Sequence, residues 1–193
     1  VAYGTLVPVT PKVSGSVKVG YTLTATPGAW GPAPVSLTYQ WYRVSSAGAV
    51  TPISGAKAST YKATASDRGY RLKVAVTGSE SGYTTADRES ALTSAVAYGT
   101  LVPVTPKVSG SVKVGYTLTA TPGAWGPAPV SLTYQWYRVS SAGAATPISG
   151  AKASTYKATA SDRGYRMKVR VTGTETGYTT AYRESTLTSS VPR

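Results

Sequence analysis

The sequence is a tandem duplication. The segment VAYGTLVP that opens the chain returns at residue 96, and the two copies then align without gaps to residue 190, at a period of 95 residues. The copies differ at eight aligned pairs: Val50/Ala145, Leu72/Met167, Ala75/Arg170, Ser79/Thr174, Ser81/Thr176, Asp87/Tyr182, Ala91/Thr186 and Ala95/Ser190. Solenoid repeats are only about 20–50 residues long, whereas a segment of this length can bury a core of its own. We therefore predict two copies of one domain, residues 1–96 and residues 97–193.

Polar and apolar residues alternate in several short segments of each copy. In the first copy these segments are residues 21–25, 37–43 and 70–76, with a weaker one at 59–63. Successive side chains of a strand point to opposite faces, so Trp41, Tyr70 and Leu72 are predicted to point inward. Turn residues rich in Gly and Pro separate the segments. Short strands divided by turns predict an all-β fold, a sandwich of two sheets.

The chain is strongly basic, with 20 Lys and Arg against 7 Asp and Glu and a net charge of +13. Such a charge can steer a protein toward anionic polymers. The sequence shows no recognition helix, zinc-finger spacing or basic arm, so we expect no specific nucleic-acid partner. An anionic cell-wall polymer or an acidic glycan is the candidate partner. The plainer alternative, which we favour, is a solvated surface that keeps the protein soluble.

The sequence lacks the residues on which most catalytic and metal sites depend. It contains no Cys, His or Asn, which excludes thiol nucleophiles, the usual catalytic triads and the commoner zinc sites. The few carboxylates form no evident cluster, so we expect no catalytic residue, no metal and no cofactor. No apolar run approaches the roughly 18 residues that a membrane span needs.

Two features of each copy are candidate binding surfaces. The first is Trp30, with Trp125 in the second copy, in a loop rich in Gly and Pro at residues 27–34. An exposed Trp can stack on a sugar ring, but large aromatic side chains are usually buried, and we favour a Trp that plugs the end of the sandwich. The second is the outward face of one sheet, for which a solvated face is again the favoured alternative. Its residues are Tyr42, Arg71 and Lys73, and, in the second copy, Tyr137, Arg166, Lys168, Arg170 and Tyr182.

The second copy carries more positive charge on this face. Arg170 stands where the first copy has Ala75, and Tyr182 stands where it has Asp87. Arg170 therefore extends Arg166 and Lys168 into three cations at alternate positions, spaced by about 6–7 Å along one strand. We predict that any affinity for an anionic polymer resides mainly in this copy and weakens steeply with salt.

Particular residues resemble those of immunoglobulin (Ig) domains. Trp41, within YQWYR, looks like the tryptophan of the third strand of these domains, and residues 67–72, DRGYRL, resemble their tyrosine corner. The resemblance places Leu23 and Leu72 at the two positions of the Ig disulfide, which this chain lacks. The corresponding trio of the second copy is Leu118, Trp136 and Met167.

A second resemblance covers essentially the whole chain. Residues 19–30, 37–43, 53–56, 76–78 and 82–83 resemble the tandem Ig-like repeats of secreted and surface-anchored bacterial proteins. The resemblance implies two Ig-like domains arranged end to end in an extracellular or cell-surface protein. It also implies a non-catalytic stalk, spacer or display module, joined to further domains of a larger exported polypeptide. Two alternatives stay open: an adhesin or a module that binds glycan or cell-wall polymer, and an accessory region of a secreted enzyme whose catalytic domain lies elsewhere.

Overall fold

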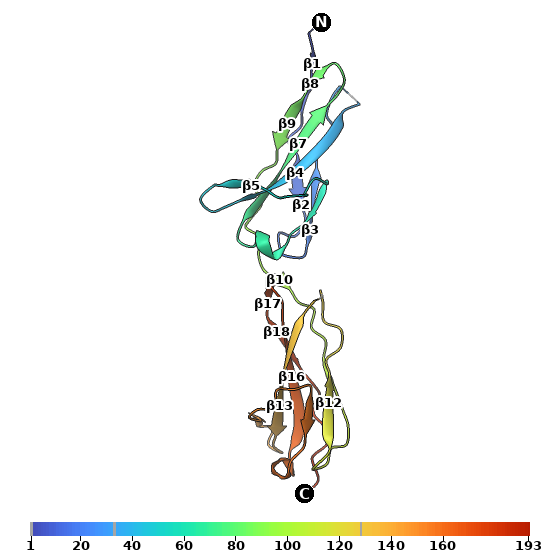
Figure 1. Cartoon of the computed structure of the whole chain (residues 1–193), viewed down its shortest axis with the longest axis vertical. Coiled ribbons are helices and arrows are strands. Elements are labelled where there is room, and N and C mark those ends of the chain that lie inside the picture. The colour runs from blue at the N-terminus through green and yellow to red at the C-terminus, as the bar shows by residue number, and fades with distance from the viewer. Residues whose placement is uncertain (1, 33, 128) are drawn as a thin grey trace. The chain divides into compact units, whose positions relative to one another are not determined.

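The computed structural model describes residues 2–32, 34–127 and 129–193. Val1, with which the first predicted copy begins, and Ala33, in the predicted Trp30 loop, lie outside the described residues. The chain forms two compact units, Val1–Gly99 and Thr100–Arg193, and Figure 1 shows the strands of each. Each unit is an Ig-like β-sandwich, as predicted.

The described residues of the first unit form nine strands and one short 3-10 helix. They are β1 (Gly4–Thr5), β2 (Lys12–Ser14), β3 (Thr22–Thr26), β4 (Ser36–Val44), β5 (Val50–Pro52), β6 (Thr60–Lys62), η1 (Ala65–Asp67), β7 (Arg71–Ser79), β8 (Tyr83–Thr84) and β9 (Ala86–Glu89). The second copy repeats them as β10 (Gly99–Thr100), β11 (Lys107–Ser109), β12 (Thr117–Thr121), β13 (Ser131–Val139), β14 (Ala145–Pro147), β15 (Thr155–Lys157), η2 (Ala160–Asp162), β16 (Arg166–Thr174), β17 (Tyr178–Thr179) and β18 (Ala181–Glu184).

Two antiparallel sheets make up each sandwich. In the first unit one sheet has the order β2-β3-β6 and the other the order β5-β4-β7-β9. The long pair β4 and β7 forms the middle of the larger sheet, with Trp41 opposite Val74. A short parallel pair, β1 with β8, lies at one end of the unit (Figure 1). The second unit repeats this order with its own strands.

The residues that the Ig resemblance places in the centre form the core. Leu23, Trp41 and Leu72 are completely buried. The Trp41 ring lies 5.8 Å from that of Tyr61, and its Nε1 donates a 3.0 Å hydrogen bond to the carbonyl of Ala58. Leu118, Trp136 and Met167 are equally buried in the second unit. Met, whose volume is close to that of Leu, therefore replaces it in the same enclosed position, a swap that cores tolerate well.

Tyr70, which was predicted to point inward, and Tyr21, which begins another alternating segment, are both exposed. Tyr70 is 40% exposed and Tyr21 43% exposed. Both precede their strands by one residue, because a turn still holds the backbone there. Gly69 adopts a positive φ of 83°, and the N–H of Tyr70 closes the turn onto the carbonyl of Asp67. The alternation of β7 therefore starts at Arg71, and Tyr70 does not act as the tyrosine of an Ig corner.

The first unit is completed by residues that the sequence period assigns to the second copy. Val96 is 2% exposed, and its backbone pairs with residues 69 and 70. The N–H of Ala97 donates to the carbonyl of Val17, and its carbonyl accepts from the N–H of Val19. The unit thus ends three residues later than the predicted boundary, because the last pairing segment is encoded at the start of the next sequence repeat.

Candidate functional site

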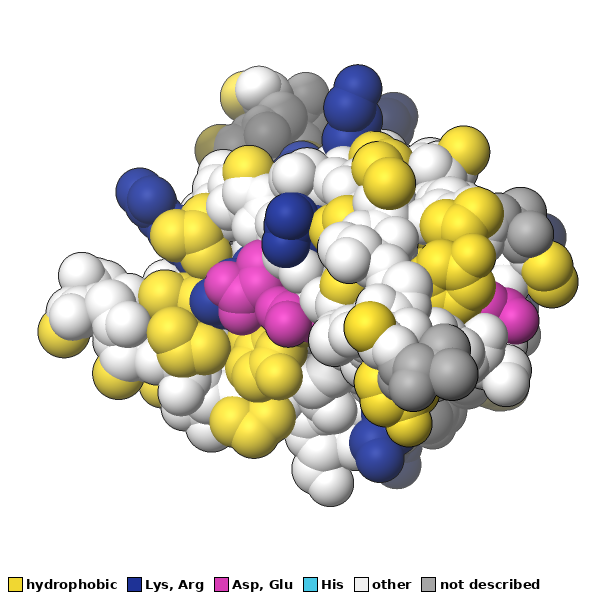
Figure 2. Space-filling model, turned by 90° about the horizontal axis from the view of Figure 1, so that it is seen from above, with side chains coloured by type: hydrophobic (Ala, Val, Ile, Leu, Met, Phe, Trp, Pro, Cys, Tyr) yellow, Lys and Arg dark blue, Asp and Glu magenta, His cyan; other side chains and the backbone are white. Residues whose placement is uncertain are grey.

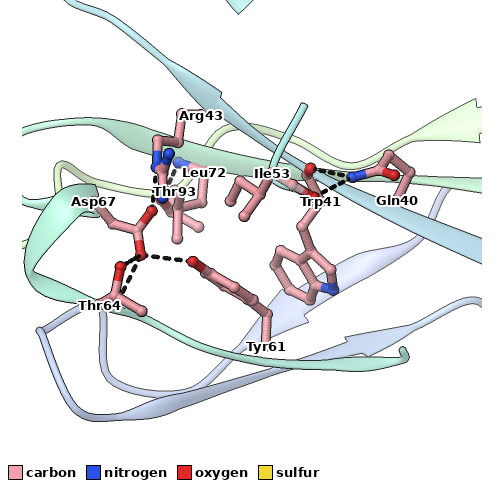
Figure 3. A network of polar contacts seen from close by, with 9 residues as sticks. All are labelled: Gln40, Trp41, Arg43, Ile53, Tyr61, Thr64, Asp67, Leu72 and Thr93. Carbon is pink, nitrogen blue, oxygen red and sulfur yellow. Dashed lines mark hydrogen bonds and ion pairs between the residues drawn. The ribbon is translucent and has the colours of Figure 1, made fainter. Parts of the chain in front are cut away.

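The most enclosed polar group of the first unit is the carboxylate of Asp67, which is completely buried. Its Oδ2 accepts hydrogen bonds from the hydroxyl of Tyr61 at 2.7 Å, from the N–H of Thr64 at 2.6 Å and from the Thr64 hydroxyl at 2.9 Å. Its Oδ1 is ion-paired with Nε of Arg43. Figure 3 shows these groups converging on the carboxylate from β4, β6 and the turn.

These contacts determine the protonation state of Asp67. Burial on its own raises the pKa of a carboxyl group, but hydrogen bonds from Thr64, Tyr61 and Arg43 outweigh it and hold the pKa of Asp67 below its usual value. Burial and the bond to Asp67 raise the pKa of the Tyr61 hydroxyl. The carboxylate is therefore a charged acceptor engaged on both oxygens, which suits a structural anchor better than an acid or base in catalysis.

The second unit contains the same cluster. Asp162 is completely buried and accepts from Tyr156, Thr159 and Arg138. Its pKa is likewise lowered, because these hydrogen bonds outweigh the effect of burial. The roles of the arginine and of the tyrosine were not predicted from the sequence. The one signal in the sequence is the spacing Thr64-x-x-Asp67, which is typical of a capping box at a helix start.

Gln40 lies on the outward face, but its side-chain amide is hydrogen-bonded to backbone carbonyls of the same sheet and of the segment beside it. Its Nε2 donates to the carbonyls of Trp41 at 2.8 Å and Ile53 at 2.9 Å, as seen in Figure 3. Gln135 makes the same two contacts in the second unit. The amide therefore joins β4 to the segment that follows β5.

Trp30 and Trp125 do not form a binding surface. They are only 6% and 7% exposed, and Nε1 of Trp30 donates to the carbonyl of Pro27 at 3.1 Å. The Trp30 ring packs onto Gly78, where an added Cβ would lie 2.5 Å from the ring. This packing fits the favoured alternative, a Trp that plugs the sandwich, and not the candidate binding role of Trp30 and Trp125. Each ring closes one end of its sandwich.

The outward face of the first unit is electrically balanced. Tyr42 lies opposite Lys73 in the sheet, with Nζ 5.8 Å from the ring centre, and Lys73 is ion-paired with Glu89 at 2.6 Å. Arg71 is exposed at the start of the same strand. Asp87, on the neighbouring strand β9 opposite Thr77, adds a second carboxylate to this face.

The second unit brings its candidate residues together into a tighter cluster. Nζ of Lys168 lies 2.6 Å from Oε2 of Glu184, and Nε and Nη2 of Arg170 donate to Oε1 of the same carboxylate at 3.0 and 2.8 Å. The guanidinium carbon of Arg170 lies 4.6 Å from the ring centre of Tyr182 and 5.4 Å from that of Tyr137. The predicted row of three cations is present, but two of its members share one carboxylate.

The pKa values of this cluster follow from its ion pairs. Hydrogen bonds from Lys168 and Arg170 outweigh the effect of burial and lower the pKa of Glu184. The hydrogen bond to Glu184 raises the pKa of Arg170. Glu184 and Arg170 are therefore both charged at neutral pH, and Glu184 holds the guanidinium in a fixed position between two tyrosines.

The described residues outside these clusters show no further candidate site for a metal or a membrane. Figure 2 shows one face of the molecule, on which Lys and Arg side chains are scattered and some lie beside acidic side chains. Within the described ranges, no three His, Cys, Asp or Glu side chains lie close enough to hold a metal ion. The same residues include no helix long and apolar enough to span a bilayer.

Comparison with known proteins finds a likeness to solved structures but none to a family model or a curated protein. A solved structure described as "Tandem Ig repeats of Dlar" is similar, at 11% sequence identity and a TM-score of 0.26. The match covers 94% of this chain and 93% of that one. By the strand order of its two units, the chain is a tandem pair of β-sandwiches.

Proposed function

We propose that the pair is a non-catalytic spacer or display module of a larger exported bacterial protein. Its task is to add length between the groups attached at its two ends. The observation that carries the proposal is the path of the chain within each unit.

In the first unit the chain enters and leaves at opposite ends of β7. Gly4 and Thr5 pair with Tyr83 and Thr84, just beyond the last residue of that strand. Ala95 pairs with Arg71, the first residue of the strand, and Val96 pairs with Arg68. A strand rises about 3.3 Å per residue, so the first and last of the nine residues of β7 lie about 26 Å apart, and the two pairing points are separated by at least this distance. Figure 1 shows β1 and β8 at one end of this unit and the turn η1 at the other.

The second unit repeats this path. Its last bridges join Ser190 to Arg166 and Val191 to Arg163, at the start of β16, whereas β17 follows the end of that strand. A unit crossed in this way contributes its length to the path of the chain. The β-sandwich is also an architecture that many cell-surface domains share, which agrees with the exported location that the sequence resemblance implies.

The spacer function is tested by counting copies. Proteins with one, two and three copies, cut after the residue equivalent to Gly99, are labelled at both ends and measured by energy transfer and solution scattering. We expect each added copy to lengthen the largest dimension by at least about 26 Å, the length of its central strand. A dimension that stays constant on adding a third copy would exclude a spacer. For the exported location, an antibody against the pair should label intact cells of the source bacterium, and labelling only after lysis would argue against it.

A further inference from the structure

We propose that the outward face of the second unit binds an acidic polysaccharide, a polymer of sugar rings that carry carboxylates. We define this surface, the unit-2 face, by its residues: Tyr137, Arg166, Lys168, Arg170, Tyr182 and Glu184. The inference goes beyond the spacer function, which requires no ligand.

The two units provide a direct comparison, because their frames are nearly identical. Among the eight differences, Ala75/Arg170 and Asp87/Tyr182 lie on adjacent strands of this face, and the new side chains contact one another: Arg170 lies 4.6 Å from the ring centre of Tyr182. The corresponding residues of the first unit, Ala75 and Asp87, lie on the same neighbouring strands. The second unit therefore carries a paired cation and aromatic ring that its copy lacks.

Charge complementarity decides the sign of the ligand. In the first unit two cations, Arg71 and Lys73, face two carboxylates, Asp87 and Glu89. On the unit-2 face three cations face the single carboxylate of Glu184. The outward face of the first unit is therefore neutral, whereas the unit-2 face has a net charge of +2 on the same arrangement of strands. An anionic partner gains from this difference, and a neutral one does not.

The geometry of Arg170 favours a carboxylate as the anion. A guanidinium has five N–H donors in a planar fork that matches a carboxylate, and Glu184 occupies two of them. Glu184 thereby fixes the fork in place, so that little side-chain entropy is lost when the other donors bind a ligand.

The tyrosines of the unit-2 face favour a ligand in which the carboxylate is attached to a sugar ring. Tyr182 is 55% exposed, and the Tyr137 ring lies beside Lys168 and Arg170. A pyranose ring has an apolar C–H face that packs on such rings, whereas its carboxylate reaches the adjacent cation. Cations at alternate positions of β16 offer the next contacts along the strand, at a spacing of about 6–7 Å.

The experiment exchanges the two faces. The probe is polygalacturonate, titrated into the full 193-residue chain at about 20 mM and about 150 mM salt. The double variant Arg170→Ala and Tyr182→Asp gives the second unit the residues of the first, which the fold already tolerates. The reverse variant, Ala75→Arg and Asp87→Tyr, gives both units the same face. The matched control, Lys152→Ala and Lys157→Ala, removes the same net charge from exposed positions near or on β15 of the other sheet.

We expect the first variant to weaken binding roughly threefold to tenfold, in proportion to one lost cation–aromatic pair and its contacts. The control should change binding by less than about twofold, and the reverse variant should strengthen it. Equal losses in the first variant and in the control would overturn the proposal, because net charge alone would then govern binding. Duplex DNA that binds as tightly as polygalacturonate would overturn it in favour of unselective attraction to polyanions, and so would an absence of binding at both salt concentrations.

Discussion

The backbone N–H of Val96 donates a 2.8 Å hydrogen bond to the carbonyl of Tyr70. Val96 opens the second sequence repeat, yet this bond and its buried side chain close the first unit. The structural unit is therefore offset from the sequence period. Val191 repeats the relationship with Tyr165 at 2.9 Å and is 1% exposed.

This offset makes Val96 a core residue of the first unit. The substitution Val96→Ala removes two buried methyl-sized groups and should lower the free energy of unfolding of that unit by about 1–3 kcal/mol. Amide hydrogen exchange resolved by unit measures the loss. The control Val102→Ala removes the same groups from a side chain that is 66% exposed and should cost less than about 0.5 kcal/mol. Equal protection in both variants would show that Val96 does not belong to the core.

Ala97 differs from its counterpart Pro192 in a way that can be tested. The N–H of Ala97 donates to the carbonyl of Val17 at 3.0 Å, and proline has no N–H to donate. The substitution Ala97→Pro should therefore destabilise the first unit by about 1–3 kcal/mol, since the acceptor loses its partner. Thermal unfolding of the full chain provides the measurement. Ala97→Gly, which retains the N–H, serves as the control, and a similar loss in both variants would assign the effect to chain flexibility.

Trp41 is the largest fully buried side chain of its unit, and truncation should leave a cavity. We expect Trp41→Ala to cost about 3–5 kcal/mol, enough to unfold the first unit at moderate temperature. The second unit, with Trp136 intact, is the reference within the same molecule. Calorimetry should therefore show the unfolding transition of the second unit at its original temperature, whereas that of the first unit moves to a lower temperature or disappears. A single unchanged transition would contradict the assignment of Trp41 to the core.

Alternation predicted the long strands because each has one buried and one solvated face. Alternation located β3, β4 and β7 and the central residues Leu23 and Trp41, because these strands are long enough for the pattern of polar and apolar residues to show. It did not locate β8 or β9, because strands of two and four residues are too short to show a period. Tyr70 was wrongly predicted to point inward because it lies in a turn, where side chains do not alternate between the two faces of a sheet.

The polar anchor and the unit-2 face depend on contacts between distant segments. Arg43 and Asp67 are 24 residues apart in the sequence, and nothing in either segment indicates that they pair. The burial of Trp30 has a faint signal in Gly78, a glycine inside a strand, which often marks close approach of another group. The sequence predicted the three cations of β16, but the position of Glu184 between two of them follows only from the register of β18.

The charged state of Asp67 and Asp162 predicts how stability depends on pH. Both carboxyls have a folded pKa below the usual value, since hydrogen bonds from threonine, tyrosine and arginine outweigh their burial. In the unfolded chain an aspartate titrates near about pH 3.9. Their contribution to stability is therefore fully present above that pH, because both states are then ionised. Below it the unfolded chain binds protons first, and the contribution is lost as the pH falls through the folded pKa.

Thermal unfolding followed from pH 7 down to pH 2 should accordingly show little change in neutral solution and a steep loss of stability below about pH 4. The variant Asp67→Asn removes the titrating group from the first unit and leaves Arg43 without its ion pair, which should cost about 3–5 kcal/mol at neutral pH. The difference between variant and wild type should then shrink as the pH falls, because protonation removes the same charge from the native carboxylate. Glu80→Gln, at a partly exposed position, controls for the loss of one carboxylate. A difference between Asp67→Asn and wild type that stays constant down to pH 2 would show that packing of the side chain, and not its charge, anchors the turn.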